Sequence, residues 1–178
     1  KSNVYLTGTA LDADFISKNN LTSNVVNSSD TAVNSDQLVI QYLPQYTLDD
    51  KGTASTTDDE LVGGFDCEGT ELRFNKASIG LQVVVQRYFL RADSNKATNE
   101  SSALALACDA GHYALETPAA ISSYGDAGEI IMKRVDHFRV LLGVEANGMH
   151  RYMPVSSYMA LTAPRPRILS VQLGALVR

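Results

Sequence analysis

The chain lacks long apolar runs, glycine-rich phosphate loops and a positive net charge, and each shortage argues against a class of protein. No window approaches about 18 consecutive apolar residues, so the sequence predicts no transmembrane helix. Neither a Gly-x-Gly-x-x-Gly run nor a Gly-x-Ser-x-Gly elbow occurs, which argues against nucleotide-binding enzymes and α/β-hydrolases. The formal net charge of −5 argues against a dedicated nucleic-acid-binding protein.

Histidine is also scarce, with His112, His137 and His150 as its three positions. They lack the close ligand spacing of a structural zinc site. Asp136 directly precedes His137, and neighbours in a strand point to opposite faces, so this pair cannot act as part of a catalytic triad. We expect His112 and His150 on the surface because each follows a turn signal. A hydrolase using His137 or His112 stays an alternative to a protein without catalysis.

Cysteine occurs twice, at Cys67 and Cys108, each in a short apolar run that ends at a turn signal. Two cysteines are too few for a disulfide scaffold, and too few for a closed zinc site on their own. The pattern predicts one disulfide in an exported protein. Closing the loop between the two cysteines is worth about 4 kcal/mol by the chain-entropy estimate.

The remaining composition, 44% hydrophobic and 20% charged over 178 residues, suits one globular domain with a core. Residues 1–34 are rich in Ser, Thr, Asn and Asp. We expect them to be irregular apart from a short helix over 10–18, which Thr9 would cap. Residues 35–178 are expected to form a β-rich domain.

The β-rich part alternates apolar runs with turn signals. A tight turn over 66–69, a hairpin turn at Asp109-Ala110-Gly111 and the Asn147-Gly148 signal connect neighbouring runs. Arg87 interrupts the apolar face of its run. Short strands at close spacing predict an α+β domain that is predominantly antiparallel β. The expected strands cover 36–42, 61–65, 70–74, 81–91, 104–108, 112–115, 135–145, 151–154 and 168–177.

An acidic stretch precedes the first cysteine, and clustered carboxylates on a flexible loop attract calcium. Its spacing does not match an EF-hand loop, so a solvated hairpin tip is the other interpretation of residues 49–66. The acids of this stretch are Asp49, Asp50, Asp58, Asp59, Glu60 and Asp66.

Six segments in order resemble the globular domain of PilW-type minor pilins. The resemblance extends over 35–178 and includes the strand-like Val-x-x-Phe-x-Val-x-x-Gly-Val pattern that begins at Val135. The segments are SDQLVIQY (35–42), DCEG (66–69), VVVQRYF (83–89), LAC (106–108), VDHFRVLLGV (135–144) and PRILSVQL (166–173).

This resemblance implies a type IV pilus subunit related to the J-type pseudopilins of type II secretion. Such subunits carry a long apolar N-terminal helix that a prepilin peptidase processes. That helix is not in this sequence, so we expect the chain to be a piece of a longer protein. The resemblance also implies that the Cys67–Cys108 bond ties the turn over 66–69 to the hairpin over 108–111, as a structural link.

The function implied is non-enzymatic, with no cofactor and no metal. Such a minor pilin primes pilus assembly at the filament tip with other minor pilins, the major pilin and a large tip adhesin. It supports twitching motility, adhesion and, as a further expectation, DNA uptake. Its location is the periplasmic side of the inner membrane before assembly and the cell-surface pilus afterwards. The alternative is a secreted β-rich adhesin or binding module that binds calcium through residues 49–66.

Overall fold

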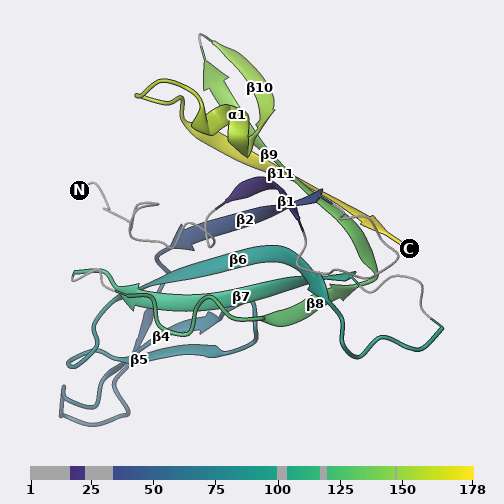
Figure 1. The fold of residues 1–178 in the computed structure, drawn as a ribbon. Helices are drawn as coiled ribbons and strands as arrows, with labels where there is room; N and C mark the ends of the chain where they lie inside the picture. The colour runs from purple at the N-terminus through teal and green to yellow at the C-terminus, as the bar shows by residue number, and fades with distance from the viewer. Residues whose placement is uncertain (1–16, 23–33, 100–103, 117–119, 147) are drawn as a thin grey trace. The chain divides into compact units, whose positions relative to one another are not determined.

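The computed structural model describes residues 17–22, 34–99, 104–116, 120–146 and 148–178. In this part of the chain the strands form three sheets, accompanied by one short helix (Figure 1). The predominantly antiparallel β class predicted from the sequence is confirmed. The elements are β1 (Lys18–Thr22), β2 (Asn34–Tyr42), β3 (Thr47–Asp49), β4 (Glu60–Phe65), β5 (Glu71–Asn75), β6 (Gln82–Ala92), β7 (Leu104–Ala114), β8 (Glu129–Lys133), β9 (Val135–Ala146), β10 (Met149–Pro154), α1 (Val155–Met159) and β11 (Ile168–Val177).

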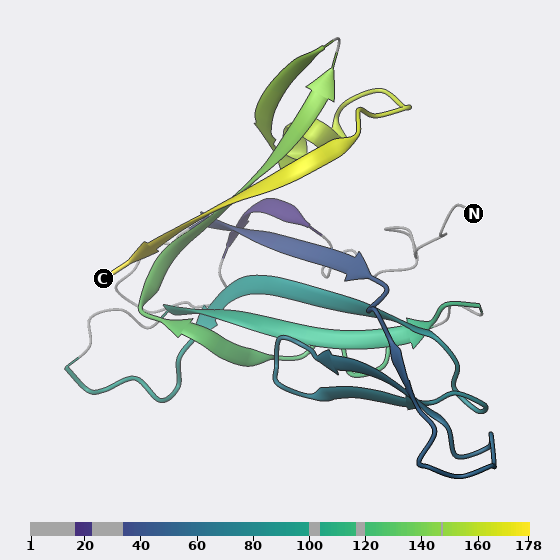
Figure 2. The ribbon, with the colours of Figure 1, turned by 180° about the vertical axis from the view of Figure 1, so that it is seen from behind.

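The strands of the described residues are ordered β1-β2-β6-β7-β8 in the largest sheet, and β10-β9-β11 and β3-β4-β5 in the two smaller ones. Figure 2 shows from behind how β11 runs alongside β9. None of the described residues form a helix that is long and apolar enough to cross a membrane, since α1 has only five residues.

Contacts between residues divide the chain into two compact units. Each unit is assembled from segments that lie far apart in the sequence, and β2, β6, β7 and β8 contribute residues to both units. The domain boundary predicted after residue 34 stays a prediction. Within the described residues, unit 1 contains Val39–Arg87 and Cys108–Glu129, and unit 2 contains Ser17–Leu38, Tyr88–Ala107 and Ile130–Arg178.

Strand β6 forms the core of unit 1 because both of its faces are covered. Val84 packs with Leu72 and Phe74 of β5 on one face. Val83 and Val85 pack with Tyr113 of β7 on the other. A strand covered on both faces can carry apolar residues at consecutive positions, as β6 does at Val83, Val84 and Val85.

Strand β7 runs unbroken from Leu104 to Ala114, so the hairpin predicted at Asp109-Ala110-Gly111 is wrong. These three residues are buried in the strand, and Asp109 pairs with Arg87 of β6. A side chain at Gly111 would collide with Ser122 and Tyr124. Asp109 therefore serves a buried ion pair, and Gly111 allows another segment to lie close to the strand. Preferences of these residue types for turns do not reveal either role.

Strand β9 is the central strand of its sheet in unit 2 (Figure 1). β10 pairs with it only from Leu141 onward. Before that point, side chains of β2 bond its backbone: Ser35 bonds both the N–H and the carbonyl of Phe138, each at 2.9 Å, and Asp36 accepts the Val140 N–H at 2.8 Å. These bonds satisfy buried backbone groups that would otherwise be costly.

Two of the predicted turns are confirmed. The turn over 66–69 joins β4 to β5, and Gly148 lies between β9 and β10. The helix expected over 10–18 falls mostly outside the described residues. Its last residue, Lys18, begins β1, which pairs antiparallel with β2. Residues 18–22 are therefore neither helical nor irregular, because strand pairing supplies their backbone partners.

Candidate functional site

Cys67 and Cys108 form a disulfide with a Cα–Cα distance of 6.1 Å across 41 residues of sequence. Cys67 lies in the turn between β4 and β5, while Cys108 lies inside β7. The bond therefore joins a turn to a buried strand, not a turn to a hairpin as expected. Asp66 closes the turn, because its carboxylate accepts the N–H groups of Glu68 and Thr70, each at 2.9 Å.

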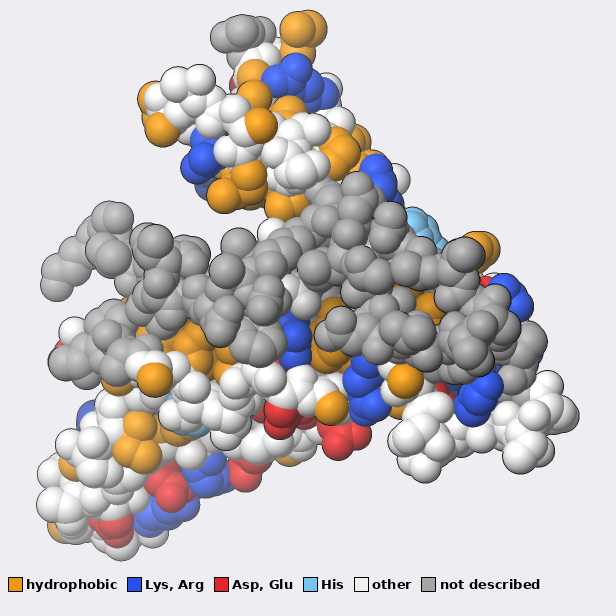
Figure 3. All heavy atoms as spheres, viewed as in Figure 1, with side chains coloured by type: hydrophobic (Ala, Val, Ile, Leu, Met, Phe, Trp, Pro, Cys, Tyr) orange, Lys and Arg blue, Asp and Glu red, His pale blue; other side chains and the backbone are white. Residues whose placement is uncertain are grey.

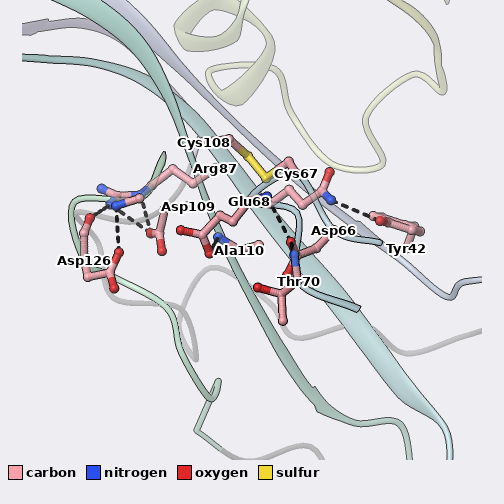
Figure 4. The surroundings of a disulfide bond; sticks show 12 residues. Tyr42, Asp66, Cys67, Glu68, Thr70, Arg87, Cys108, Asp109, Ala110 and Asp126 are labelled. Atoms are coloured by element: carbon pink, nitrogen blue, oxygen red, sulfur yellow. Dashed lines mark hydrogen bonds and ion pairs between the residues drawn. A yellow bond between two sulfur atoms is a disulfide. The ribbon is translucent and has the colours of Figure 1, made fainter. Parts of the chain in front are cut away.

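An acidic residue follows each cysteine directly, so the disulfide also brings two carboxylates together. Glu68 follows Cys67 and Asp109 follows Cys108. Asp126, from the segment between β7 and β8, joins them (Figure 4). One oxygen from each of the three carboxylates lies within 4.8 Å of the others. We call Glu68, Asp109 and Asp126 the carboxylate cluster; among the described residues it is the group that could hold a metal ion.

Arg87 of β6 extends its guanidinium into this cluster (Figure 4). Its Nε donates to Asp109 Oδ2 at 2.9 Å, and its Nη2 lies 2.8 Å from the same oxygen. Nη2 also donates to the backbone carbonyl of Asp126 at 2.6 Å. Arg87, which interrupts the apolar pattern of its strand, is therefore buried and paired.

The two oxygens of Asp109 differ in their surroundings. Oδ2 accepts the Gly125 N–H at 3.0 Å in addition to the bonds from Arg87. Oδ1 has no hydrogen-bond partner, and water cannot supply one because Asp109 is 0% exposed. Glu68 points toward Asp109, and its Oε2 accepts the Ala110 N–H at 3.1 Å (Figure 4).

Gly128 allows the segment that carries Asp126 to lie directly against β7. Its φ is +57°, and a Cβ there would collide with the backbone of Cys108 and Asp109. Asp126 accepts the Gly128 N–H at 2.7 Å, which holds the carboxylate within the segment. A glycine is needed at this position both for its left-handed backbone and for the space it leaves.

Burial raises the pKa of Asp109, and the Gly125 N–H and Arg87 offset that effect only in part. Burial also raises the pKa of Glu68, and the charges of Asp109 and Asp126 act in the same direction. Both shifts arise because carboxylates are gathered where water is limited, with one guanidinium among them.

The acidic stretch over 49–66 has a different environment, since cations pair with its carboxylates. Arg73 bonds Asp49 at 2.8 Å and Glu60 at 2.7 Å, and Lys51 contacts the same two carboxylates at 3.2 and 2.5 Å. The bond from Arg73 is the main reason that the pKa of Asp49 falls to about 2. Calcium binding by this stretch stays a prediction, and Lys51 and Arg73 already pair with Asp49 and Glu60.

The three histidines lie in different strands, His112 in β7, His137 in β9 and His150 in β10. His112, predicted on the surface, is half-buried: its ring lies 4.7 Å from that of Phe74, and its Nδ1 lies 3.2 Å from Gln82 Oε1. Burial lowers its pKa. The nearby Asp109 bonds Arg87, not this histidine. His150 is exposed, as predicted.

A second candidate site is the edge strand β11. It contains no charged residue, and every one of its ten residues is exposed. Among the described strands it pairs with β9 alone. Figure 3 shows hydrophobic side chains at the surface formed by β10, α1 and β11. The apolar side chains exposed on β11 include Ile168, Leu169, Val171, Leu173, Leu176 and Val177.

Strand pairing shows why this exposure is unusual. Leu173 lies opposite Val140 of β9, and Val171 lies opposite Leu142. Residues directly opposite each other point to the same face of a sheet. Val140 and Leu142 are buried, whereas Leu173 is 54% exposed. The layer that covers β9 therefore ends before β11, and the apolar face continues uncovered.

No family model, curated protein or solved structure matches this chain. The resemblance to PilW-type minor pilins therefore depends on the sequence segments alone, and the family stays a prediction.

Sequence reasoning found the disulfide and missed the carboxylate cluster. Two signals pointed to it: an acid directly after each cysteine, and an arginine within a run that reads as buried strand. A buried arginine needs an acidic partner. The third member, Asp126, lies in the cluster because the backbone at Gly128 packs closely against that of β7. The sequence contains no signal for this contact.

Proposed function

We propose that the chain is the globular part of a non-enzymatic minor pilin, which joins a type IV pilus through the exposed strand β11. The observation that carries the proposal is this uncharged apolar strand at the edge of a sheet. An edge strand offers unpaired backbone groups, and proteins normally protect such edges with charges or a covering element. β11 has neither among the described residues, which suits a surface that a neighbouring subunit covers.

The occupant that we propose is another pilin subunit, which would add a strand to the outer edge of β11 and pack on its apolar face. Main-chain bonds then supply affinity and side chains supply specificity. The partner would cover the exposed apolar side chains of β11, so that the apolar layer that begins on β9 continues across the contact. An exposed apolar area of this kind is typical of interaction sites.

The disulfide supports an exported protein, because such bonds persist mainly outside the reducing cytosol. In the proposed function the subunit is held at the periplasmic side of the inner membrane and then enters the pilus tip. There it primes assembly with other minor pilins, the major pilin and a tip adhesin. Twitching motility, adhesion and DNA uptake depend on it through the filament.

The test uses two leucines that are each 54% exposed, one on β11 and one on β3. Leu173→Lys should abolish surface pili and co-purification of other pilins when the full-length protein is expressed in a deletion strain. Leu48→Lys should leave both unchanged. Both purified variants should unfold at the same urea concentration as the unmodified protein, since neither leucine is buried.

Normal piliation of the deletion strain would overturn the proposal. A full-length gene product without an N-terminal prepilin cleavage site and apolar helix would overturn it as well. If Leu173→Lys assembles like Leu48→Lys, β11 is not the contact.

A further inference from the structure

We propose that the carboxylate cluster of Glu68, Asp109 and Asp126 binds a calcium ion. This site is independent of the proposed function, and it differs from the acidic stretch that the sequence suggested. All of its residues lie in unit 1.

The hydrogen bonds of Asp109 leave one of its two oxygens available to a cation. Asp109 Oδ1 is buried without a hydrogen-bond partner, while Oδ2 is held by Arg87 and Gly125. A buried polar atom without a partner costs free energy, so such atoms are rare in folded proteins. A cation bound to Oδ1 would remove this cost without disturbing the bonds to Oδ2. Glu68 points toward the same carboxylate and supplies a second oxygen (Figure 4).

Charge balance favours a divalent ion. The cluster contains three carboxylates, and Arg87 is the guanidinium that bonds Asp109 and the Asp126 backbone within it. With all three acids ionised, two negative charges stay unbalanced. Asp109 is buried, and like charges gathered around a buried carboxylate are unfavourable unless a counter-charge is present. One divalent cation completes the balance.

The donor set favours calcium over other divalent ions. All three side chains offer oxygen, and no histidine or free thiol belongs to the cluster, so soft metals have no preferred ligand. Calcium accepts several carboxylate oxygens in a flexible shell, which suits three carboxylates that come from three separate segments. Magnesium demands regular octahedral geometry and keeps several of its waters, so it is usually held by one or two carboxylates.

A bound ion would link three segments of unit 1: the turn between β4 and β5, strand β7, and the segment before β8. The disulfide already links the first two. Calcium would therefore attach the segment that carries Asp126, which contacts β7 without a covalent bond.

The experiment is calcium titration of the metal-free, oxidised protein, followed by calorimetry and by thermal unfolding. The variants are Glu68→Gln and Asp126→Asn, which keep acceptor oxygens for the N–H groups of Ala110 and Gly128. The matched control is Asp58→Asn, from the exposed acidic stretch. We expect one site, calcium stabilisation well above that of magnesium, and at least a tenfold loss of affinity in both cluster variants. The control should bind like the unmodified protein.

Amide NMR spectra provide a second measurement that needs no variant. Calcium should shift the signals of Ala110 and Gly125 before those of residues 50–60. Absence of calcium binding to the unmodified protein would overturn the proposal, and a proton on Asp109 Oδ1 would then satisfy the site. Loss of binding in Asp58→Asn, with the cluster variants unaffected, would overturn it in favour of the acidic stretch. Equal affinity for magnesium would overturn the choice of calcium.

Discussion

Strands β6 and β11 have similar lengths and opposite environments. β6 contains two arginines and two glutamines, yet most of it is buried. β11 contains no charged residue, and all of it is exposed. The more apolar strand is therefore the more exposed one. Hydrophobicity alone does not decide which strand becomes core.

The difference lies in the neighbours of each strand. β6 has β2 on one side and β7 on the other, with apolar clusters on both faces. The polar side chains that are buried in β6 have partners, as Arg87 does in Asp109 and Gln86 in Tyr42. Among the described strands, β11 has β9 alone beside it. A strand so placed is stabilised by its contacts to one neighbour and is available to a partner.

The largest expected effect comes from placing the same charge in both strands. Val84→Asp in β6 should destabilise the fold by about 4 kcal/mol or more, because it buries an unpaired carboxylate. Val171→Asp in β11 should change stability by less than about 0.5 kcal/mol, since the side chain stays in water. Urea unfolding followed by circular dichroism measures both. A large loss in Val171→Asp would show that β11 is covered in solution.

Removing the disulfide beside β6 should have the next largest effect. The double variant Cys67→Ala, Cys108→Ala should lose about 4 kcal/mol, because the unfolded chain regains the freedom of the closed loop. The measurement is urea unfolding of the oxidised protein and the variant. Native mass spectrometry of protein made in an oxidising compartment provides the control, since two free thiols there would contradict the bond.

A smaller, pH-dependent effect should come from His112, which packs near β6. Its folded-state pKa is lowered by burial, while its unfolded-state pKa is about 6.5. Below that pH the unfolded chain binds a proton that the folded chain still excludes, so stability falls as the pH falls. Phe74 and Gln82 face the ring, and Asp66 opposes the shift through its charge.

The variant His112→Gln should flatten this dependence of stability on pH between about pH 7 and pH 5, and His150→Gln, at an exposed position of β10, should not. Unfolding curves at several pH values measure the difference between each variant and the unmodified protein. Comparing variants in this way isolates the contribution of His112 to the pH dependence of stability. Asp109 and Glu68 contribute in the opposite direction, because their raised pKa values stabilise the folded state as the pH falls. Equal curves for both histidine variants would contradict the prediction.

The smallest effect should come from the exposed ion pairs of Arg73, because water and salt screen such pairs. Arg73→Gln should leave the unfolding midpoint almost unchanged, and about 1 M salt should remove any remaining difference. The pKa of Asp49 should nevertheless rise from about 2 toward its ordinary value of 3.8. NMR titration of the Asp49 carboxyl measures this rise. An unchanged pKa would mean that the pair does not form in solution.

The local sequence pattern was sufficient to predict a strand wherever apolar residues alternate or run between two turn signals. Alternation and flanking turns predicted the strands around Val84, Val140 and Leu173, and the turn over 66–69. The pattern failed at Asp109-Ala110-Gly111, where turn-forming residues lie inside β7. It also missed β3, a strand of three residues that depends on pairing with β4. In both cases a distant partner outweighs the local preference.

The sequence by itself determined the antiparallel β class, since the two-residue period of its apolar runs is a local property. It also determined the disulfide, because the chain has only Cys67 and Cys108 to pair. Only the tertiary structure decided that Asp109 lies beside Glu68, Asp126 and Arg87, and that β11 is an uncovered edge. Burial, pairing and exposure depend on which distant segments meet, and no local pattern encodes that.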